Sequence, residues 1–173
     1  MSRISELEIL SPSSEGAAIK QGSNKEEFSH SQILDSRRKM ALLYPELSKK
    51  ILGIAIQLHR EMGCGFKEKV YQDAFEVLLK EEGVKYEREK QIDLVFHGVK
   101  LEHDFFYDFL IEDKIGVELK AVSEIIGEFE SQIINYLHVS NHKLGLLLNY
   151  GTTSLEYCWY PNEWHYRDKA SIG

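Results

Sequence analysis

The chain has 173 residues, 43% of them hydrophobic and 28% charged, and its formal net charge is −7. This length fits one domain with an appendage, and this composition excludes a fully disordered or fibrous chain. No apolar run reaches the roughly 18 to 20 residues that cross a bilayer, and the N-terminus lacks the apolar stretch of a signal peptide, so we expect a cytoplasmic protein without membrane contact.

The first 40 residues have the composition of a tail. They contain nine serines, with six basic and six acidic residues, and show no sustained helical or strand periodicity. Such a segment is expected to be disordered or weakly ordered, which leaves residues 41–173 as the folded domain and places the whole negative charge there. Met40 directly precedes the patterned region and is a second candidate for the start of translation.

Two helices are predicted at the start of the domain. From Pro45 onward, apolar residues recur at helical spacing until Gly63 and Gly65 stop the pattern. A second amphipathic stretch covers about residues 67–82, and Gly83 closes it.

Short strand-like runs follow. Residues 85–96, 99–111 and 115–122 predict three antiparallel strands, with turns at His97-Gly98 and around Asp113. A third helix over about residues 127–139 precedes strands at 144–150 and 155–159. The order α-α-β-β-β-α-β-β predicts an α/β fold.

The stretch from residue 108 to residue 121 is the most informative. If Asp113 centres a three-residue turn, residues whose numbers sum to 226 are paired, and Asp108 lies directly opposite Glu118. Because side chains alternate along a strand, Lys120 shares the face of Glu118, whereas the opposite, apolar face carries Val117, Leu119 and Ala121.

Two facing carboxylates repel each other, and a divalent cation is the usual way to keep both ionised. Mg²⁺ suits them, with Mn²⁺ as a substitute, because it accepts one or two carboxylates together with water and phosphate oxygens. A nearby lysine can then orient a water that the cation activates, which is what phosphodiester hydrolysis requires. The alternative is an exposed polar face on which Lys120 simply pairs with Glu118 or Asp108.

Several motifs in order resemble the GxxExxY protein family. They are Gly65-Phe-Lys-Glu68-Lys-Val-Tyr71, Asp108-x(9)-Glu118-Leu-Lys120-Ala, Gln132-Ile-Ile-Asn-Tyr136-Leu and the stretch from Gly145 to Gly151. That family is grouped with the PD-(D/E)xK nuclease superfamily, and the Q-x(3)-Y helix motif is similar to the RecB-type exonuclease branch. The resemblance implies a restriction-endonuclease-like mixed β-sheet flanked by helices. One departure is Tyr107, which stands where the superfamily pattern has proline.

The resemblance also implies residue roles. Asp108, Glu118 and the backbone carbonyl of Leu119 would be metal ligands, Lys120 would be the catalytic lysine, and Glu68 would complete the metal site directly or through water. Gln132 and Tyr136 would face the substrate phosphates, although hydrogen bonding between helix and sheet is an equal alternative.

Further residues are candidates for substrate contact. Tyr71 shares a helix face with Glu68, and its alternative role is to close the core with its hydroxyl at the rim. The expected phosphate contacts are a basic group composed of Lys67, Lys69, Lys85, Arg88 and Lys90, which surface solvation explains equally well.

The sequence therefore favours a Mg²⁺-dependent nuclease, with DNA favoured over RNA as substrate and a homodimer or larger complex as an expected assembly. One alternative is a catalytically silent PD-(D/E)xK scaffold that binds nucleic acid or protein, and another is hydrolysis of a different phosphate ester. The net charge of −7 is unfavourable for nucleic-acid binding, because phosphate recognition usually leaves a basic surface.

Overall fold

A computed structural model describes residues 43–162, so the tail expected over residues 1–40 lies outside the described residues. The elements in chain order are α2 (Pro45–Met62), α3 (Glu68–Glu81), β1 (Tyr86–Ile92), β2 (Val95–Phe96), β3 (Val99–Lys100), β4 (Phe105–Ile111), β5 (Ile115–Lys120), α4 (Gly127–Ser140), β6 (Leu144–Asn149) and β7 (Glu156–Pro161).

The two leading helices form where the sequence predicts them. Pro45 occupies the first turn of α2, where its missing N–H has no helical partner to lose. The helix ends at Gly63, whose φ of +68° few other residues adopt at low cost. Gly83, with φ +62°, follows the end of α3 in the same way.

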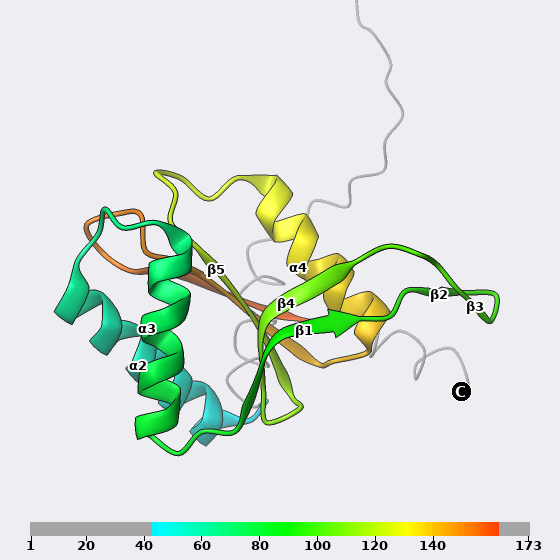
Figure 1. Cartoon of the computed structure of the whole chain (residues 1–173), viewed down its shortest axis with the longest axis horizontal. Coiled ribbons are helices and arrows are strands. Elements are labelled where there is room, and N and C mark those ends of the chain that lie inside the picture. The colour runs from blue at the N-terminus through cyan, green and yellow to red at the C-terminus, as the bar shows by residue number, and fades with distance from the viewer. Residues whose placement is uncertain (1–42, 163–173) are drawn as a thin grey trace, which may run out of the picture.

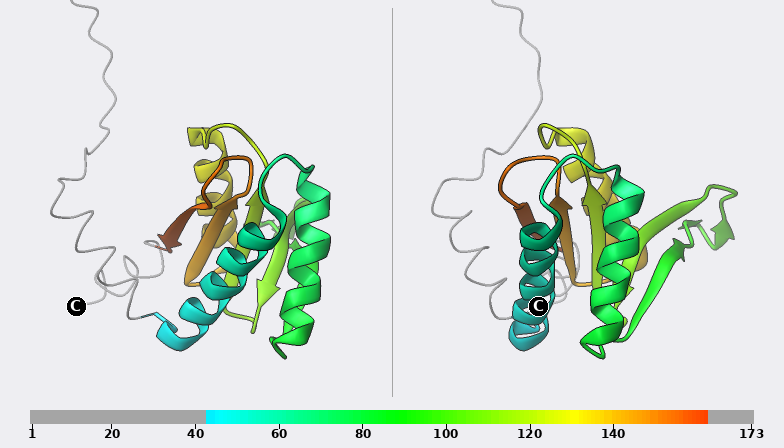
Figure 2. Two further views of the ribbon diagram at one scale, coloured as in Figure 1. Left: turned by 90° about the vertical axis from the view of Figure 1, so that its left-hand side faces the viewer. Right: turned by 60° about the vertical axis from the view of Figure 1, so that its left-hand side comes forward.

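Five strands form one mixed sheet in the order β1-β4-β5-β6-β7. All neighbouring pairs are antiparallel except β5 and β6, which are parallel and are joined through α4. Helices α2 and α3 cover one face of the sheet and α4 covers the other (Figures 1 and 2). This is the predicted mixed sheet flanked by helices.

Each face has its own core. Against α2 and α3 the sheet contributes buried residues such as Phe109, Val117 and Leu119, which pack with Tyr71 and Phe75 of α3. The smaller cluster beneath α4 consists of Ile92, Tyr107 and Leu110, with Tyr136 and Val139 packed on it. No helix within residues 43–162 is both long enough and apolar enough to cross a membrane.

The prediction of three long antiparallel strands is wrong in one respect. The strands expected over 85–96 and 99–111 are both interrupted, because β2 and β3 form a separate ribbon that projects beyond the sheet (Figure 1). The expected turn at His97-Gly98 connects them, with positive φ at both residues. Val95, Phe96 and Val99 are more than half exposed, so this apolar run continues beyond the core that would hold it in the main sheet.

Gly116 permits the close approach of β5 to β4. A Cβ atom at this position would overlap the ring of Tyr107, which is fully buried and held by a hydrogen bond between its hydroxyl and Ser140 Oγ. We expect Gly116→Ala to lower the free energy of unfolding by about 1 to 3 kcal/mol through overpacking. Denaturant titration followed by circular dichroism measures this change.

Gly53→Ala is the matched control, because a Cβ on this residue of α2 meets nothing within 4 Å. Alanine is a better helix former than glycine, so the free energy of unfolding of the control is expected to rise by up to about 1 kcal/mol. A Gly116→Ala protein with the unfolding midpoint of the wild type would contradict the described packing of Tyr107.

Candidate active site

The ladder between β4 and β5 opens next to Asp108. β4 pairs with β1 from Phe105 to Ile111, whereas its pairs with β5 in the described sheet run from Ile111–Ile115 to Phe109–Val117. Those pairs have the predicted register, but the ladder ends one pair before Asp108 and Glu118 would meet. Asp108 Oδ2 instead accepts a hydrogen bond from the backbone N–H of Leu119 at 2.7 Å.

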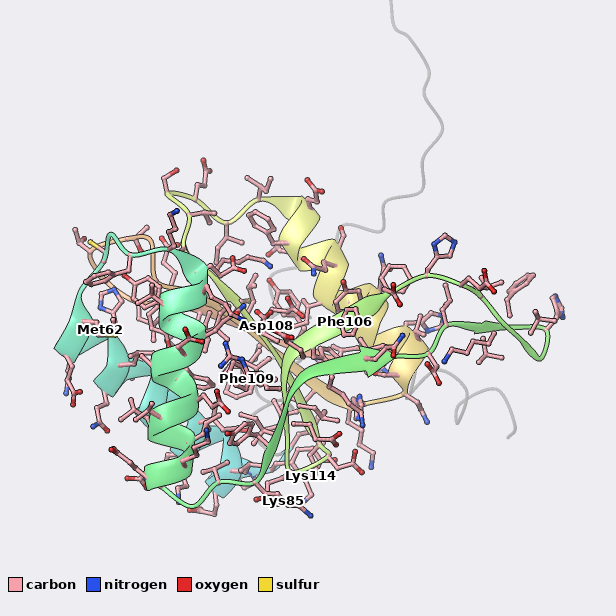
Figure 3. The ribbon with its side chains drawn as sticks, viewed as in Figure 1. Met62, Lys85, Phe106, Asp108, Phe109 and Lys114 are labelled. Atoms are coloured by element: carbon pink, nitrogen blue, oxygen red, sulfur yellow. The ribbon has the colours of Figure 1, made fainter. Side chains whose placement is uncertain are left out.

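The expected direct pairing of Asp108 with Glu118 is therefore corrected. The carboxylate of Asp108 bonds to a backbone group of β5, which ties the two strands together where their ladder has ended. The Asp108 side chain consequently extends from β4 to β5, and Figure 3 shows this residue in the view between α3 and α4. Charge interactions still couple it to Glu118.

Glu118 is the most constrained carboxylate of the site. Its side chain is about 2% exposed. Its Oε2 atom lies 3.5 Å from Lys120 Nζ and 3.5 Å from Gln132 Nε2, and its Oε1 atom has no hydrogen-bond partner among the described residues. Burial raises the pKa of Glu118 well above its ordinary value, the nearby charge of Asp108 raises it further, and Lys120 opposes both.

Two more carboxyl groups share this environment. Burial raises the pKa of Asp108, while the Leu119 N–H, Lys120 and a hydrogen bond from the Gln72 side chain lower it. Glu68, the first residue of α3, is partly buried, and burial raises its pKa as well. Lys120 lowers the pKa of Glu68 and Asp108 raises it, so the charge of this one lysine acts on all three carboxyl groups.

The predicted faces of β5 are confirmed. Lys120 lies with Glu118, whereas Val117 and Leu119 belong to the opposite core. Its Nζ atom lies 5.4 Å from the centre of the Phe129 ring, within cation–π range. The ammonium group is therefore held between Glu118 and the first turn of α4.

These residues fit a hard divalent cation. A buried carboxylate oxygen without a hydrogen-bond donor is energetically costly, and a cation is a partner that would remove that cost. The available donors are carboxylate and carbonyl oxygens, the ligands that Mg²⁺ prefers. Within residues 43–162 no three His, Cys, Asp or Glu residues are grouped closely enough to hold a metal by themselves, so water or substrate oxygens would have to complete the set.

Gln132 and Tyr136 both reach the site from α4. Gln132 Nε2 donates to the Tyr136 hydroxyl at 3.1 Å and lies near Glu118 Oε2. The Tyr136 ring also packs edge-on against Phe105 and Tyr107 of β4. The structure thus brings the predicted pair next to the carboxylates, and contact with phosphate stays a prediction.

Tyr71 lies in the core. Its side chain is fully buried and stacks on Tyr150, with ring centres 4.7 Å apart. Its hydroxyl donates to the Gly63 carbonyl at 2.8 Å and accepts from the Phe66 N–H at 3.3 Å. This placement favours its alternative role, which is to fix the loop that leads into α3 and Glu68.

The basic group does not form a single patch. Lys69 pairs with Glu89 at 2.8 Å, Lys90 pairs with Glu87 at 2.6 Å, and Arg88 binds both Asp73 and Glu76. Lys85 lies beside the β4–β5 turn, away from Asp108 (Figure 3). Lys67 is exposed and directly precedes Glu68 at the start of α3, which keeps it a candidate for phosphate contact.

Two residues beside Asp108 were missed in the sequence. Gln72 is buried although polar, and it lies one helical turn after Glu68, a spacing that could have identified it. Glu89 has a φ of +50° inside β1, between the paired residues Arg88–Phe109 and Lys90–Tyr107. The alternating pattern of β1 contains no signal for this local distortion opposite Asp108.

The burial of Glu118 makes folding stability depend on pH. A pKa that is higher in the folded state than the ordinary 4.5 means that the folded state holds its proton more tightly. Without a cation, the free energy of unfolding should therefore fall as pH rises above about 4.5. Glu118→Gln removes this ionisation, so its free energy of unfolding at pH 8 in EDTA should exceed that of the wild type by about 1 to 3 kcal/mol.

Thermal unfolding with EDTA and with Mn²⁺ checks this expectation. Mn²⁺ should raise the Tm of the wild type and leave Glu118→Gln unchanged, because ligands stabilise the state that binds them. Glu81→Gln, an exposed substitution on α3, is the charge-matched control and should behave as the wild type. Equal Mn²⁺ stabilisation of all three proteins would contradict a cation site at Glu118.

Solved structures that are similar to part of this chain include two proteins. Among solved structures, similarity is found to an alkaline exonuclease (LHK-Exo) from Laribacter hongkongensis, with 11% identity, a TM-score of 0.43 and 61% of each chain covered. It is also found to SSO0001, with 16% identity, a TM-score of 0.45 and coverage of 61% of this chain and 57% of that one. The chain thus spans about three fifths of the length of each.

A search of curated proteins gave no match. The sequence profile of the PD-(D/E)XK nuclease superfamily, however, matches residues 45–158, which include α2, α3, the whole candidate site and the first half of β7. The chain belongs to the PD-(D/E)XK nuclease superfamily.

Proposed function

We propose that this protein is a Mg²⁺-dependent nuclease that hydrolyses phosphodiester bonds of nucleic acid, with Mn²⁺ as a substitute and DNA as the favoured substrate. The observation that carries the proposal is the buried Oε1 atom of Glu118, which has no hydrogen-bond partner among the described residues and lies in a site shared with Asp108 and Lys120. Membership in a nuclease superfamily supports it.

Asp108, Glu118 and the Leu119 carbonyl would hold the cation, and Glu68 would complete the set directly or through water. A divalent cation there would supply a Lewis acid that activates water and offsets charge on the phosphate. The hydrogen bond from the Leu119 N–H already fixes Asp108 relative to the carbonyl-bearing strand.

Lys120 would orient the attacking water and offset negative charge as the phosphate reacts. Its position beside Glu118 keeps the ammonium at the edge of the carboxylate group. A phosphate that approaches the carboxylates therefore meets one positive charge that the protein has already placed. The remaining repulsion would have to be offset by the cation.

Gln132 and Tyr136 would bind the phosphate oxygens. The Gln132 amide donates to the Tyr136 hydroxyl oxygen, which leaves the hydroxyl proton free to be donated onward. Burial raises the pKa of Tyr136, so this proton is retained at neutral pH. A neutral donor of this kind suits an anionic substrate.

The order of motifs, from Gly65-x-x-Glu68-x-x-Tyr71 to Gln132-x(3)-Tyr136, supports assignment to the GxxExxY family and its likeness to RecB-type exonucleases. A second candidate function is binding without cleavage. The pairing of Lys69, Arg88 and Lys90 with acidic residues favours a protein partner in that case, since these side chains offer little unbalanced charge to a phosphate backbone.

The direct test is incubation of the purified chain with single- and double-stranded DNA and RNA in Mg²⁺, Mn²⁺ or EDTA. We expect cation-dependent cleavage that Glu118→Gln and Lys120→Ala each reduce by ~100-fold or more, because positioned catalytic groups contribute factors of this size. Glu81→Gln is again the control.

Cleavage that is unchanged in both site variants would show a contaminating enzyme and overturn the proposal. Binding without cleavage in every cation would favour the scaffold function. Cleavage of small phosphate esters alone would assign a different substrate to the same site.

A further inference from the structure

The segment between β5 and α4 connects the two halves of the site. β5 ends at Lys120, and α4, which contributes Phe129, Gln132 and Tyr136, begins at Gly127. Residues 121–126 therefore determine how the lysine lies relative to the helix. A contact that fixes this segment therefore restrains the position of α4 relative to Lys120.

Asn149 makes such a contact. It is fully buried at the end of β6, directly beside Lys120 in the parallel register. Its Oδ1 atom accepts from the Val122 N–H at 3.0 Å, and its Nδ2 atom donates to the Val122 carbonyl at 3.0 Å. The side-chain amide thus pairs with both backbone groups of Val122, as a neighbouring strand would.

The amide itself is held in place. Oδ1 also accepts from the Gly151 N–H at 3.0 Å, and Nδ2 also donates to Glu156 Oε2 at 2.8 Å. Two donors and two acceptors are all that an asparagine amide offers, so its hydrogen-bonding capacity is fully used. Its orientation is consequently fixed from β7 as well as from β6.

Gly151 allows the two segments to approach this closely. A Cβ atom at this position would overlap the backbone nitrogen, carbon and oxygen of Val122. The Tyr150 N–H, between Asn149 and Gly151, donates to the Lys120 carbonyl at 2.8 Å. Three consecutive residues, 149–151, thereby hold the chain from Lys120 to Val122.

We propose that Asn149 is a positioning residue that sets the Lys120 ammonium relative to Phe129 and Gln132. Val122 lies two residues after Lys120 and five residues before α4. Fixing Val122 therefore restrains both the end of β5, which carries the lysine, and the start of α4. The Lys120 ammonium lies between Glu118 of β5 and Phe129 of α4, so a shift of β5 or of α4 would change its distance from one of these two side chains. The effect on cleavage rests on the proposed nuclease function, whereas the fixation of the segment does not.

Asn149→Ala tests this role, with Asn162→Ala as the matched control. Asn162 is also a buried asparagine whose amide donates to two backbone carbonyls, those of Leu137 and His142, but it lies at the other end of α4 and β6. Both variants should lose stability. Amide hydrogen exchange, resolved by segment in the full chain, measures where each one loosens.

We expect Asn149→Ala to speed exchange over residues 121–126 by at least about tenfold beyond the change in Asn162→Ala. In a cleavage assay it should lower kcat by ~100-fold with KM little changed, since misplacing a catalytic group costs about this much. Asn162→Ala should keep the kcat of the wild type.

A second variant, Asn149→Asp with Glu156→Gln, keeps the acceptor for the Val122 and Gly151 N–H groups and reverses the contact with residue 156, but it sets a carboxylate oxygen against the Val122 carbonyl to which the amide had donated. It should therefore speed exchange over residues 121–126 and lower kcat in the same direction as Asn149→Ala, and it provides the test if Asn149→Ala does not fold. Exchange that rises over the whole chain in every Asn149 variant, or kcat that falls equally in Asn162→Ala, would overturn the proposal. If the wild type cleaves nothing, the exchange pattern still decides whether Asn149 fixes the segment.

Discussion

The site depends on one energetically unfavourable feature, a buried glutamate side chain with one carboxylate oxygen that has no hydrogen-bond partner among the described residues. Glu118 lies on a strand between two cores, and its Oε1 atom finds no hydrogen-bond donor among the described residues. Such burial lowers stability unless an ionic partner arrives. The surrounding structure holds Glu118 in this state because β5 is central in the sheet, with β4 on one side and β6 on the other.

The opening between β4 and β5 is the second constraint. Continued pairing of the two strands would place backbone groups where the site now has carboxylates. The Leu119 N–H bonds to the Asp108 side chain instead, which keeps a buried donor satisfied while the strands separate. The same hydrogen bond therefore closes the ladder and positions the Asp108 carboxylate. Stability and site geometry are linked through a single contact.

The sequence predicted much of this arrangement. Proline and glycine at the helix ends, apolar periodicity and the turn around Asp113 were enough for the helices, the β4–β5 register and the shared face of Glu118 and Lys120. These features are local, so local patterns determine them. The separation of the strands at Asp108 was not predictable, because register arithmetic assumes that pairing continues.

Long-range contacts account for the other differences. Gln72 of α3 forms a hydrogen bond with Asp108 of β4, and Asn149 forms hydrogen bonds with Val122, which lies 27 residues away in sequence. The sequence shows where each of these two residues lies in its helix or strand, but it does not show which distant residue each one contacts. Tyr71 shows the reverse case, since its motif position suggested substrate contact and its hydrogen bonds to Gly63 and Phe66 place it in the core. Motif membership therefore does not separate residues that contact a substrate from those that support the site.

The central claim is that the buried carboxylate of Glu118 is a cation ligand, and diffraction from crystals soaked in Mn²⁺ tests it most directly. The anomalous signal of manganese should appear as a peak within coordination distance of Glu118 Oε1 and of an Asp108 carboxylate oxygen, and the peak should be absent in Glu118→Gln. A peak elsewhere, or a fully soaked crystal in which Glu118 stays without a metal neighbour, would contradict the account.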